Sequence, residues 1–449
     1  MFIPYTAPVL ARHRACLRGA RFMLVLAIAT WCGGAAAADN PLTLQEAQVR
    51  AVERSRLLAA KDHAVHASRE QAVTAARLPD PVLKLGLDNV PVEGPDRFST
   101  TRDFMTQRRI GLMQDLTRAD KRRLRAERFE READKASAEK AVVAAAIERD
   151  TALAWLDRYY FEAMAGLVTE QEQQASLEIA AAEAAYRGGR GAQADVFTAR
   201  GEAVALADRA RGLVRRVANA KLVLARWIGE AAQLPLAGKP VLDAMPLELK
   251  TLESQLGDHP EIAVLRKQED IAATEAALAR ADKKPDWSIE VAFQQRGHAY
   301  SNMLSVGVSV PLQWDQRNRQ DREVSARLAR LEQAKAESED ALRAHVAEVG
   351  AMLNEWQGNR ERQARLEQDL LPLARSRTAS AVAQYRGGKM SLADVLAARR
   401  RELDARLQVL QLEADTARLW AQLRFLVPAS GQRDANAGTD RRQQCTGKQ

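Results

Sequence analysis

The sequence predicts a mainly α-helical protein with a small β part, built as a tandem repeat of a strand hairpin followed by a long helical hairpin. Three observations lead to this fold class. A glycine-containing turn occurs twice, long proline-free segments carry helically spaced apolar residues, and short segments alternate apolar with polar residues. Aromatic residues make up only 5% and charged residues 28% of the chain, which favours long packed helices over a thick globular core.

The duplication is clearest at the two turns. Residues 186–200 and 385–399 align without a gap, and 9 of the 15 positions are identical. Glycine adopts positive φ without a Cβ penalty and ends helices, so each copy is predicted to be the bend of a helical hairpin. The turn residues are Tyr186, Arg187, Gly188, Gly189 and Asp195 in the first copy, and Tyr385, Arg386, Gly387, Gly388 and Asp394 in the second.

The first 38 residues have the features of a secretory signal peptide. Four arginines precede an apolar run at 22–31, and small residues follow at 33–38. Cys32 is a candidate for lipidation, but Trp31 is a bulky residue at the position of cleavage and disfavours it. Removal of the segment leaves Cys445 as the sole cysteine, so no intrachain disulfide and no cysteine metal site is expected.

Charge and motifs exclude several classes of function. The net charge of +8 falls to +4 without the signal, which holds four arginines and no acidic residue. This small surplus is spread along helices and does not argue for nucleic-acid binding. No later run of 18 apolar residues predicts a spanning helix. Without a nucleophile elbow, phosphate loop, CxxC or HExxH motif, we predict neither an enzyme nor a cofactor.

The helices and strands follow the same order in both halves. A helix at 44–77 stops at Leu-Pro-Asp-Pro (78–81), and alternating segments at about 82–116 predict a strand hairpin before the helical hairpin at 117–229. In the second half, strands at about 287–312 precede the helical hairpin at 316–427, where Pro372 should kink the helix. The predicted organisation is a signal peptide at 1–38, a first repeat at 39–229, a linker at 230–257, a second repeat at 258–428 and a disordered tail at 429–449.

Helix lengths constrain the arrangement. The helix at 117–186 would be about 105 Å long, whereas its partner at 192–228 reaches back only about 55 Å. The helix at 44–77 adds about 51 Å, so the two shorter helices should stack end to end along the long one. This arrangement places both strand hairpins at one end, both turns at the other, and the linker at mid-height.

The strands have two different faces. One row is apolar, and the other is small or polar and includes Lys84, Asp88, Ser288, Glu290, Ser305 and Ser309. Four strands cannot close a barrel, and lipid does not tolerate open sheet edges. Several chains are therefore predicted to pool strands into a water-filled membrane barrel with the polar row facing the lumen. A soluble sheet with one buried face is the alternative.

Over residues 42–428 the sequence resembles the TolC family of outer-membrane efflux channels. The resemblance rests on the two-fold repeat, the Leu-Pro-Asp-Pro stop, Ile110-Gly111 and Val306-Gly307, His259-Pro260-Glu261, and the paired Tyr-x-Gly-Gly-x4-Asp-Val turns. It implies a homotrimer with a 12-stranded β-barrel in the outer membrane of a Gram-negative bacterium and a trimeric α-helical tunnel through the periplasm. The implied partners are outer-membrane lipid, a periplasmic adaptor (membrane fusion protein) and an inner-membrane RND transporter.

Within this family the chain is most similar to the CzcC/CusC heavy-metal efflux branch, on residues 78–81, 88–95 and 103–106. This similarity implies export of heavy-metal cations. A channel for drug efflux or type I protein secretion is the alternative, and a periplasmic coiled-coil adaptor or scaffold is a remote one, because an adaptor has a single hairpin set. Two departures from the family are Asp115, in place of a frequent proline, and Met390, in place of an arginine.

Several turn residues have two interpretations. By resemblance, Asp394 faces the pore entrance, but Ser391 and Asp394 also have the spacing of a helix-capping box. Tyr186 and Tyr385 are expected either to hydrogen-bond between hairpins or to pack against the helical seam. The basic residues of the turns could meet an adaptor or be solvated. His63 and His66 are three residues apart on one helix, and a solvated helical face is favoured over a metal site.

Overall fold

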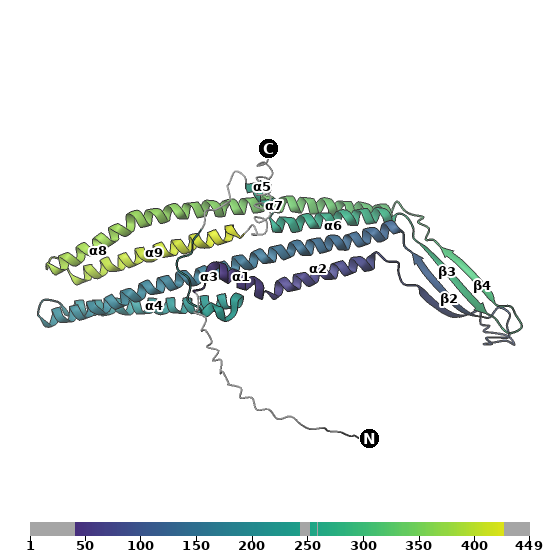
Figure 1. Ribbon diagram of the computed structural model, residues 1–449, viewed down its shortest axis with the longest axis horizontal. Coiled ribbons are helices and arrows are strands. Elements are labelled where there is room, and N and C mark those ends of the chain that lie inside the picture. Colours follow the sequence, from purple (N-terminus) through teal and green to yellow (C-terminus); the bar gives the residue numbers. More distant parts are fainter. Residues whose placement is uncertain (1–40, 243–251, 258, 426–449) are drawn as a thin grey trace, which may run out of the picture. The chain divides into compact units, whose positions relative to one another are not determined.

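The computed structural model describes residues 41–242, 252–257 and 259–425. These residues form long helices and one small sheet (Figure 1), which confirms the mainly α class. The expected signal peptide, the disordered tail and part of the linker lie outside the described residues. Among the described helices, none combines the length and the hydrophobicity that a membrane span requires. The elements are α1 (Leu44–Arg54), α2 (Arg56–Ala75), β1 (Val82–Asp88), β2 (Gln107–Leu116), α3 (Ala119–Arg187), α4 (Gln193–Ile228), η1 (Gly229–Gln233), α5 (Leu252–Leu256), α6 (Pro260–Asp282), β3 (Trp287–Gln295), β4 (Met303–Ser309), α7 (Gln320–Arg365), η2 (Leu366–Leu370), α8 (Leu371–Arg386) and α9 (Leu392–Arg424).

The prediction of one helix at 44–77 was wrong, because two helices meet at Ser55. Its backbone is extended, with φ −66° and ψ 112°, and its hydroxyl accepts a hydrogen bond from the amide of Leu58 at 3.3 Å. Serine competes well for this N-cap role. The sequence therefore restarts the helix without the glycine or proline that usually marks such a break.

The stacking expected from helix lengths is present. Helix α3 contacts α4 along one part of its length and the α1–α2 pair along the other, and Figure 1 shows these shorter helices end to end beside it. On its other side α3 contacts α6 and α9, and α7 contacts both of these. Helix α3 thus leads from the sheet at its first residue to a turn after its last.

The sheet joins the two repeats. Its order is β1-β2-β3-β4, and every neighbouring pair is antiparallel. The central pair, β2 with β3, comes from different repeats and is aligned from Arg108 opposite Gln295 to Leu116 opposite Trp287. Strands β1 and β4 each have one neighbour within this chain, so both outer edges of the sheet are unpaired among the described residues.

The helix that contains Pro372 departs from regular α geometry just before that residue. The five residues of η2 form a π-helical turn between α7 and α8. Proline lacks an amide hydrogen and clashes with the carbonyl four residues earlier, and a wider turn removes both conflicts. The ribbon changes direction there (Figure 1), as the sequence predicted.

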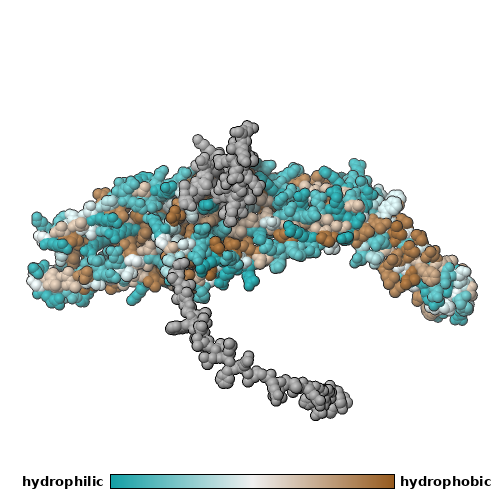
Figure 2. Space-filling model, in the orientation of Figure 1, coloured by the Kyte–Doolittle hydropathy of each residue, from teal (hydrophilic) through white to brown (hydrophobic). Residues whose placement is uncertain are grey.

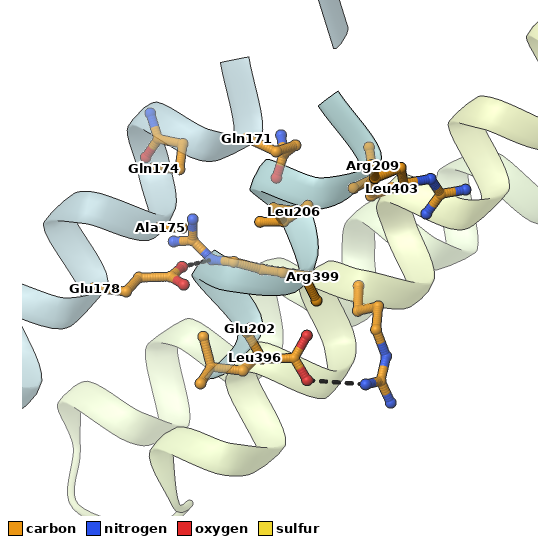
Figure 3. A pocket seen from close by; sticks show the side chains of 12 residues that line it. Gln171, Gln174, Ala175, Glu178, Glu202, Leu206, Arg209, Leu396, Arg399 and Leu403 are labelled. Atoms are coloured by element: carbon orange, nitrogen blue, oxygen red, sulfur yellow. Dashed lines mark hydrogen bonds and ion pairs between the residues drawn. The ribbon is translucent and has the colours of Figure 1, made fainter. Parts of the chain in front are cut away.

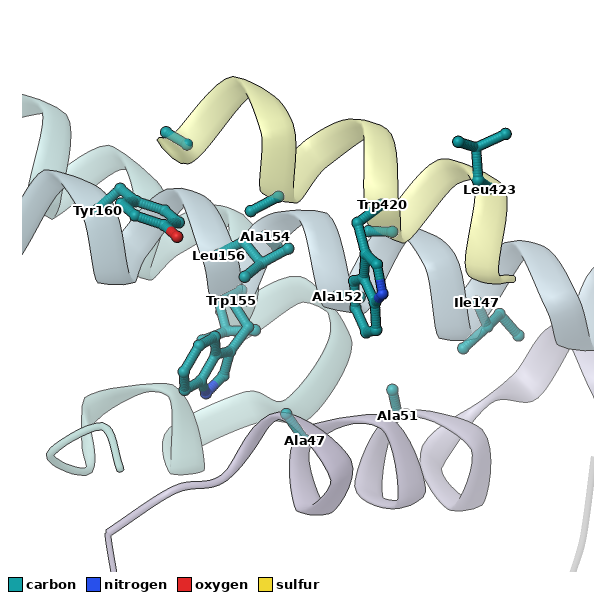
Figure 4. Packing of buried hydrophobic residues seen from close by; sticks show 14 of the residues in the cluster. Ala47, Ala51, Ile147, Ala152, Ala154, Trp155, Leu156, Tyr160, Trp420 and Leu423 are labelled. Atoms are coloured by element: carbon teal, nitrogen blue, oxygen red, sulfur yellow. The ribbon is translucent and has the colours of Figure 1, made fainter. Parts of the chain in front are cut away.

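The largest hydrophobic cluster, here called the central core, lies where α4 and α9 end. It combines residues of α1, α3, α4, η1, α5, α7 and α9, and it holds Trp155, Trp356 and Trp420. Trp155 is only 1% exposed, and its indole Nε1 donates to the carbonyl of Leu42 at 3.1 Å. Figure 4 shows Trp155 and Trp420 beside Ala47 and Ala51 of α1. The central core therefore fixes both repeats to each other at mid-height.

Candidate functional site

The strands bring the predicted lumen residues onto one face of the sheet. Lys84 Nζ lies 2.6 Å from Glu290 Oε2. Arg109 lies 3.5 Å from Glu290 Oε1 and 3.3 Å from Asp88 Oδ2. The antiparallel register explains this, because it places every second residue of neighbouring strands on the same face. The result is a charge-balanced network across β1, β2 and β3.

The serines of the predicted lumen set lie on the same face of the sheet, Ser288 on β3 and Ser305 and Ser309 on β4. Ser305 and Gln294 exchange hydrogen bonds of 2.7 and 3.0 Å between their side chains, and Ser288 is aligned with Ser309. Arg109 is the functional candidate that the predicted lumen set left out. The alternation of residues in β2 predicts which face of the sheet Arg109 lies on. Its acidic partners are on β1 and β3, however, and only the strand register shows that they lie next to Arg109.

The opposite face of the sheet is apolar and exposed. Figure 2 shows hydrophobic residues gathered over the strands, whereas the helices are mostly hydrophilic. A contiguous apolar face of this kind is unusual on a water-soluble surface. A soluble sheet would bury it, but no described element of this chain covers it. The exposed residues are Leu83, Leu85, Leu87, Ile110, Leu112, Trp287, Ile289, Val291, Phe293, Leu304, Val306 and Val308.

The two Tyr-Arg-Gly-Gly turns have the same backbone geometry. The second glycine of each adopts a left-handed conformation, with φ 68° at Gly189 and 71° at Gly388. The amide of Gly189 donates to the carbonyl of Tyr186, and that of Gly388 to the carbonyl of Tyr385, each at 3.0 Å. The sequence repeat therefore encodes one helix-ending turn twice.

We expect Gly388→Ala to destabilise the second turn by about 1 kcal/mol, because a Cβ at positive φ is strained even in open space. Nothing lies within 4 Å of the Cβ position at Gly388, so the effect would be purely conformational. Gly387→Ala is the matched control, since that residue has φ −82° and only ordinary contacts. Hydrogen exchange of the turn amides should accelerate in the first variant only. Equal acceleration in both would contradict the prediction.

The side-chain caps that follow the two turns differ. Ser391 Oγ accepts from the amide of Asp394 at 3.2 Å and donates to its carboxylate at 2.7 Å. Ala192 has no side-chain acceptor, and the first turn keeps only a bond of 3.1 Å from the Ala192 amide to Asp195 Oδ2. Asp394 is exposed and Asp195 is partly buried, so the Asp394 carboxylate is the more accessible of the two.

The turn tyrosines have different surroundings. Tyr385 packs against a buried cluster that both helical hairpins supply, and Tyr186 is 48% exposed. Neither hydroxyl makes a hydrogen bond within the described residues, so packing is the observed role of Tyr385. Met390 also packs into this region, against Ala381 and Val395. The buried cluster consists of Ala182, Val196 and Ala199 from the first hairpin and Leu392 and Leu396 from the second.

The basic residues of the turns are exposed. Arg187, Arg190, Arg386 and Lys389 form no ion pair within the described residues, so they lie in solvent as a basic rim. His63 and His66 are also exposed on α2, and His66 Nδ1 lies 3.9 Å from Glu70 Oε1. Across the described ranges, no group of three or more potential metal donors converges on one point.

A cleft of about 100 Å³ separates the two helical hairpins above the turns. Two ion pairs cross it from α9 (Figure 3). Arg399 Nε lies 2.8 Å from Glu178 Oε1 of α3, and Arg400 Nη1 lies 2.8 Å from Glu202 Oε1 of α4. In a third pair, Arg209 Nη1 of α4 lies 2.8 Å from Asp404 Oδ1 of α9. These contacts join the first hairpin to the second within one chain.

Burial is the largest influence on the pKa of Glu178. Its side chain is 14% exposed. Desolvation raises the pKa of the Glu178 carboxyl, Arg399 lowers it, and Glu202 raises it further, with a net increase. The ion pair with Arg399 therefore offsets only part of the cost of burying this charge.

This raised pKa predicts how pH affects the contact between the hairpins. The contribution of Glu178 to stability is fully present below the ordinary glutamate pKa and is lost as pH rises through the raised value. The Glu178→Gln variant should therefore be at least as stable as the wild type at pH 7.5. The difference in stability between the two proteins should become smaller towards pH 4, where the Glu178 carboxyl is protonated more often. Thermal unfolding at both pH values measures this. Glu183→Gln, in an exposed pair with Arg200, should change stability little at either pH. Greater destabilisation by Glu178→Gln at pH 7.5 than at pH 4 would contradict the prediction.

Comparison with known proteins gives a family match for the second part of the chain. Residues 251–428 match the family model described as outer membrane efflux protein. This match covers less than half of the chain. The matched range includes β3, β4 and the second turn, whereas β1, β2 and the first turn lie outside it.

Solved structures of outer-membrane proteins and channels share this fold. The outer membrane protein VceC from Vibrio cholerae aligns with a TM-score of 0.70 at 19% identity, covering 85% of this chain and 95% of its own. CusC aligns with a TM-score of 0.72 at 16% identity, covering 86% and 92%. The CmeC outer membrane channel of Campylobacter jejuni aligns at 0.71 and 12% identity, covering 85% of each chain. A search of curated protein sequences gives no significant match.

These matches confirm the resemblance to the TolC family that the motifs indicated. The structural alignments extend over both repeats, although the family model matches only residues 251–428. The first repeat is thus placed in the same fold by its structure. Its sequence signal is the Tyr-Arg-Gly-Gly turn shared with the second repeat.

Proposed function

We propose that this chain is the outer-membrane channel, or exit duct, of a tripartite efflux system of the RND type. It would act as a homotrimer in the outer membrane of a Gram-negative bacterium and extend into the periplasm. Each copy would contribute its four strands to a 12-stranded barrel, and the helices would form the tunnel below it. Its partners would be a periplasmic adaptor and an inner-membrane RND transporter.

The observation that carries this proposal is the two-faced sheet with two open edges. Its apolar face is exposed, its polar face holds the network of Lys84, Arg109 and Glu290, and β1 and β4 each lack a second neighbour among the described residues. A closed barrel made from several copies satisfies the open edges, places the apolar face in lipid and leaves the polar face in water. A periplasmic adaptor or scaffold would not account for the exposed apolar face, the polar face or the open sheet edges.

For the cargo, we propose heavy-metal cations, on the motifs at 78–81, 88–95 and 103–106. The structure adds no donor cluster in its described residues, which suits a passive duct better than a binding site. Growth of a deletion strain on graded salts of Zn, Cd, Co, Cu and Ag, with and without the gene restored, tests this cargo. Sensitivity to drugs instead of metals would support the alternative of drug efflux, and a defect in protein export would support type I secretion.

The channel itself is tested on the purified protein. We expect a trimer in detergent that forms conducting pores in planar bilayers. A monomer without conductance would contradict the proposal. This measurement is independent of the cargo, so it separates a wrong cargo from a wrong function.

We further propose that Asp394 contributes negative charge at the pore entrance in addition to capping α9. Asp394→Asn keeps a hydrogen-bond acceptor for Ser391 but removes the charge, and it should lower the cation preference of the pore measured as reversal potential in a salt gradient. Ser391→Ala removes the cap bonds, typically at a cost of about 1 kcal/mol, and should leave selectivity unchanged. An unchanged reversal potential in Asp394→Asn would restrict Asp394 to its capping role.

A further inference from the structure

The two repeats differ where the returning strand leads into the long helix. In the first repeat only residues 117–118 separate β2 from α3, whereas residues 310–319 separate β4 from α7. A duplication predicts equal connections. The longer connection, here called the junction segment (residues 310–319), therefore requires an explanation of its own.

Hydrogen bonds hold the junction segment against the end of α6. Gln313 Nε2 donates to the carbonyl of Asp282 at 3.1 Å, and Gln316 Nε2 donates to the carbonyl of Lys283 at 3.0 Å. The segment is thus tied to the end of α6 by two of its side chains, three residues apart. Trp314 lies between these two attachment points.

Trp314 lies between the two anchoring glutamines and is 88% exposed. Among the large hydrophobic side chains of the described residues, this is the highest exposed fraction. Trp314 continues a two-residue spacing that begins in β4, so it stands at the end of an apolar row. That row is Leu304, Val306, Val308, Val310, Leu312 and Trp314. In membrane barrels, tryptophan at the end of such a row lies at the level of the lipid headgroups.

Unpaired cations follow the tryptophan. Arg317, Arg319 and Arg322 are exposed, and none forms an ion pair or a side-chain hydrogen bond within the described residues. Lys283 and Arg327 neutralise two of the three neighbouring acids, and Asp315 keeps its charge beside the neutral Asn318, so the three arginines leave a local surplus of positive charge. These contacts are Asp315 with Asn318 at 2.9 Å, Asp321 with Lys283 at 2.7 Å and Glu323 with Arg327 at 2.8 Å.

We propose that the junction segment and the first turn of α7 bind the headgroups of anionic phospholipids in the periplasmic leaflet of the membrane. Trp314 lies at the boundary of the hydrocarbon region, and the three arginines bind headgroup phosphates. The proposal rests on the proposed function, because it requires the apolar face of the sheet to lie in lipid. Charge complementarity and continuity with that apolar face select a lipid over a protein partner.

Lipid retention by the purified trimer tests this site. The trimer is equilibrated with equal amounts of phosphatidylglycerol and phosphatidylcholine, and bound lipids are counted by native mass spectrometry. A surface arginine contributes on the order of fivefold to the binding of an anionic lipid. The triple variant Arg317→Gln, Arg319→Gln, Arg322→Gln should therefore lose the preference for phosphatidylglycerol by roughly tenfold or more. The charge-matched control Arg215→Gln, Arg375→Gln, Arg377→Gln changes exposed arginines far along the chain from the sheet and should keep the preference.

The depth of Trp314 is tested separately. In vesicles, lipids brominated near the headgroup should quench a fluorescence component that Trp314→Phe removes, whereas lipids brominated at the chain ends should not. Equal phosphatidylglycerol retention in the two triple variants, or quenching unchanged by Trp314→Phe, would overturn the proposal. Loss of trimers in the junction variant alone would instead indicate a contact between copies of the chain, and it would also overturn the proposal.

Failure of the proposed function has a different result. If the sheet does not enter lipid, the wild-type protein will not insert into vesicles or form pores. If only the headgroup site is wrong, the wild-type protein inserts and conducts, and both triple variants retain phosphatidylglycerol equally.

Discussion

Arg158→Met should destabilise the protein by about 3–5 kcal/mol, the range found when one partner is removed from a buried charged network. Arg158 lies in the middle of α3 and is 2% exposed. Its guanidinium has three separate partners, and all three would be lost together. We therefore expect this change to be among the most disruptive single substitutions in the chain.

The partners of Arg158 explain the size of the effect. Nη1 donates to the carbonyl of Ala232 at 2.7 Å, Nη2 to the carbonyl of Leu234 at 2.8 Å, and Nε to Glu162 Oε1 at 2.8 Å. Methionine fills a similar volume but donates nothing, so two carbonyls of the linker lose their donors. The adjacent residues of the linker bind Leu42, whose amide donates to the carbonyl of Pro235 at 2.8 Å. Loss of Arg158 should thus also loosen the N-terminal segment.

Two measurements check this prediction. The apparent unfolding temperature of the purified protein should fall, and hydrogen exchange should accelerate first at residues 234–237 and at Leu42. Arg200→Met is the matched control, because Arg200 pairs with Glu183 at 2.7 Å but is 58% exposed, and such surface pairs contribute at most about 1 kcal/mol. Similar losses of stability in the two variants would refute the anchoring role of Arg158.

The role of Arg158 illustrates what the sequence could not supply. In a helix of 69 residues, an arginine within an amphipathic pattern is most simply interpreted as a solvated side chain. Two of its partners are backbone carbonyls 74 and 76 positions away, and backbone atoms leave no residue-type signal. The same limit applies to Arg109, whose face was predictable from alternation but whose partners on β1 and β3 depend on the register.

Local features were predictable because their causes are local. The glycine pairs at 188–189 and 387–388 end helices through a backbone preference that does not depend on the rest of the chain. The alternation of Lys84 with leucines gave both faces of β1 for a similar reason. The break at Ser55 was missed because serine caps a helix only where tertiary contacts favour the break. The full length of the junction segment was also missed, since the predicted hairpin began at 316 and α7 begins at Gln320.

Lys121→Met should be the second strongly destabilising change, by about 2–3 kcal/mol, the lower part of the range for a broken buried pair. The Lys121 side chain is 4% exposed, and its Nζ lies 3.1 Å from Asp286 Oδ2 and 3.4 Å from Asp282 Oδ1. Asp286 also accepts from the amide of Arg118 at 3.0 Å. Lys121 therefore joins the start of α3 to the connection between α6 and β3, which is the point where the two repeats enter the shared sheet.

The expected loss is smaller than for Arg158 because the two aspartates are 47% and 30% exposed and can be partly solvated. Lys283→Met is the control at the same junction. Lys283 lies 2.7 Å from Asp321 but is 39% exposed, so its loss should cost less than about 1 kcal/mol. Unfolding of the purified protein in denaturant measures both variants, and equal losses would contradict the prediction.

A combined variant distinguishes two causes of the destabilisation: the lost attraction between Lys121 and the aspartates, and the two carboxylates left without a cation. If most of the cost of Lys121→Met comes from two carboxylates left beside each other, then adding Asp282→Asn and Asp286→Asn should restore much of the stability, although the chain then has three substitutions instead of one. Asparagine at 286 still has an acceptor for the Arg118 amide. No recovery would mean that the lysine acts mainly through the packing of its buried stem. The junction would then depend on shape more than on charge.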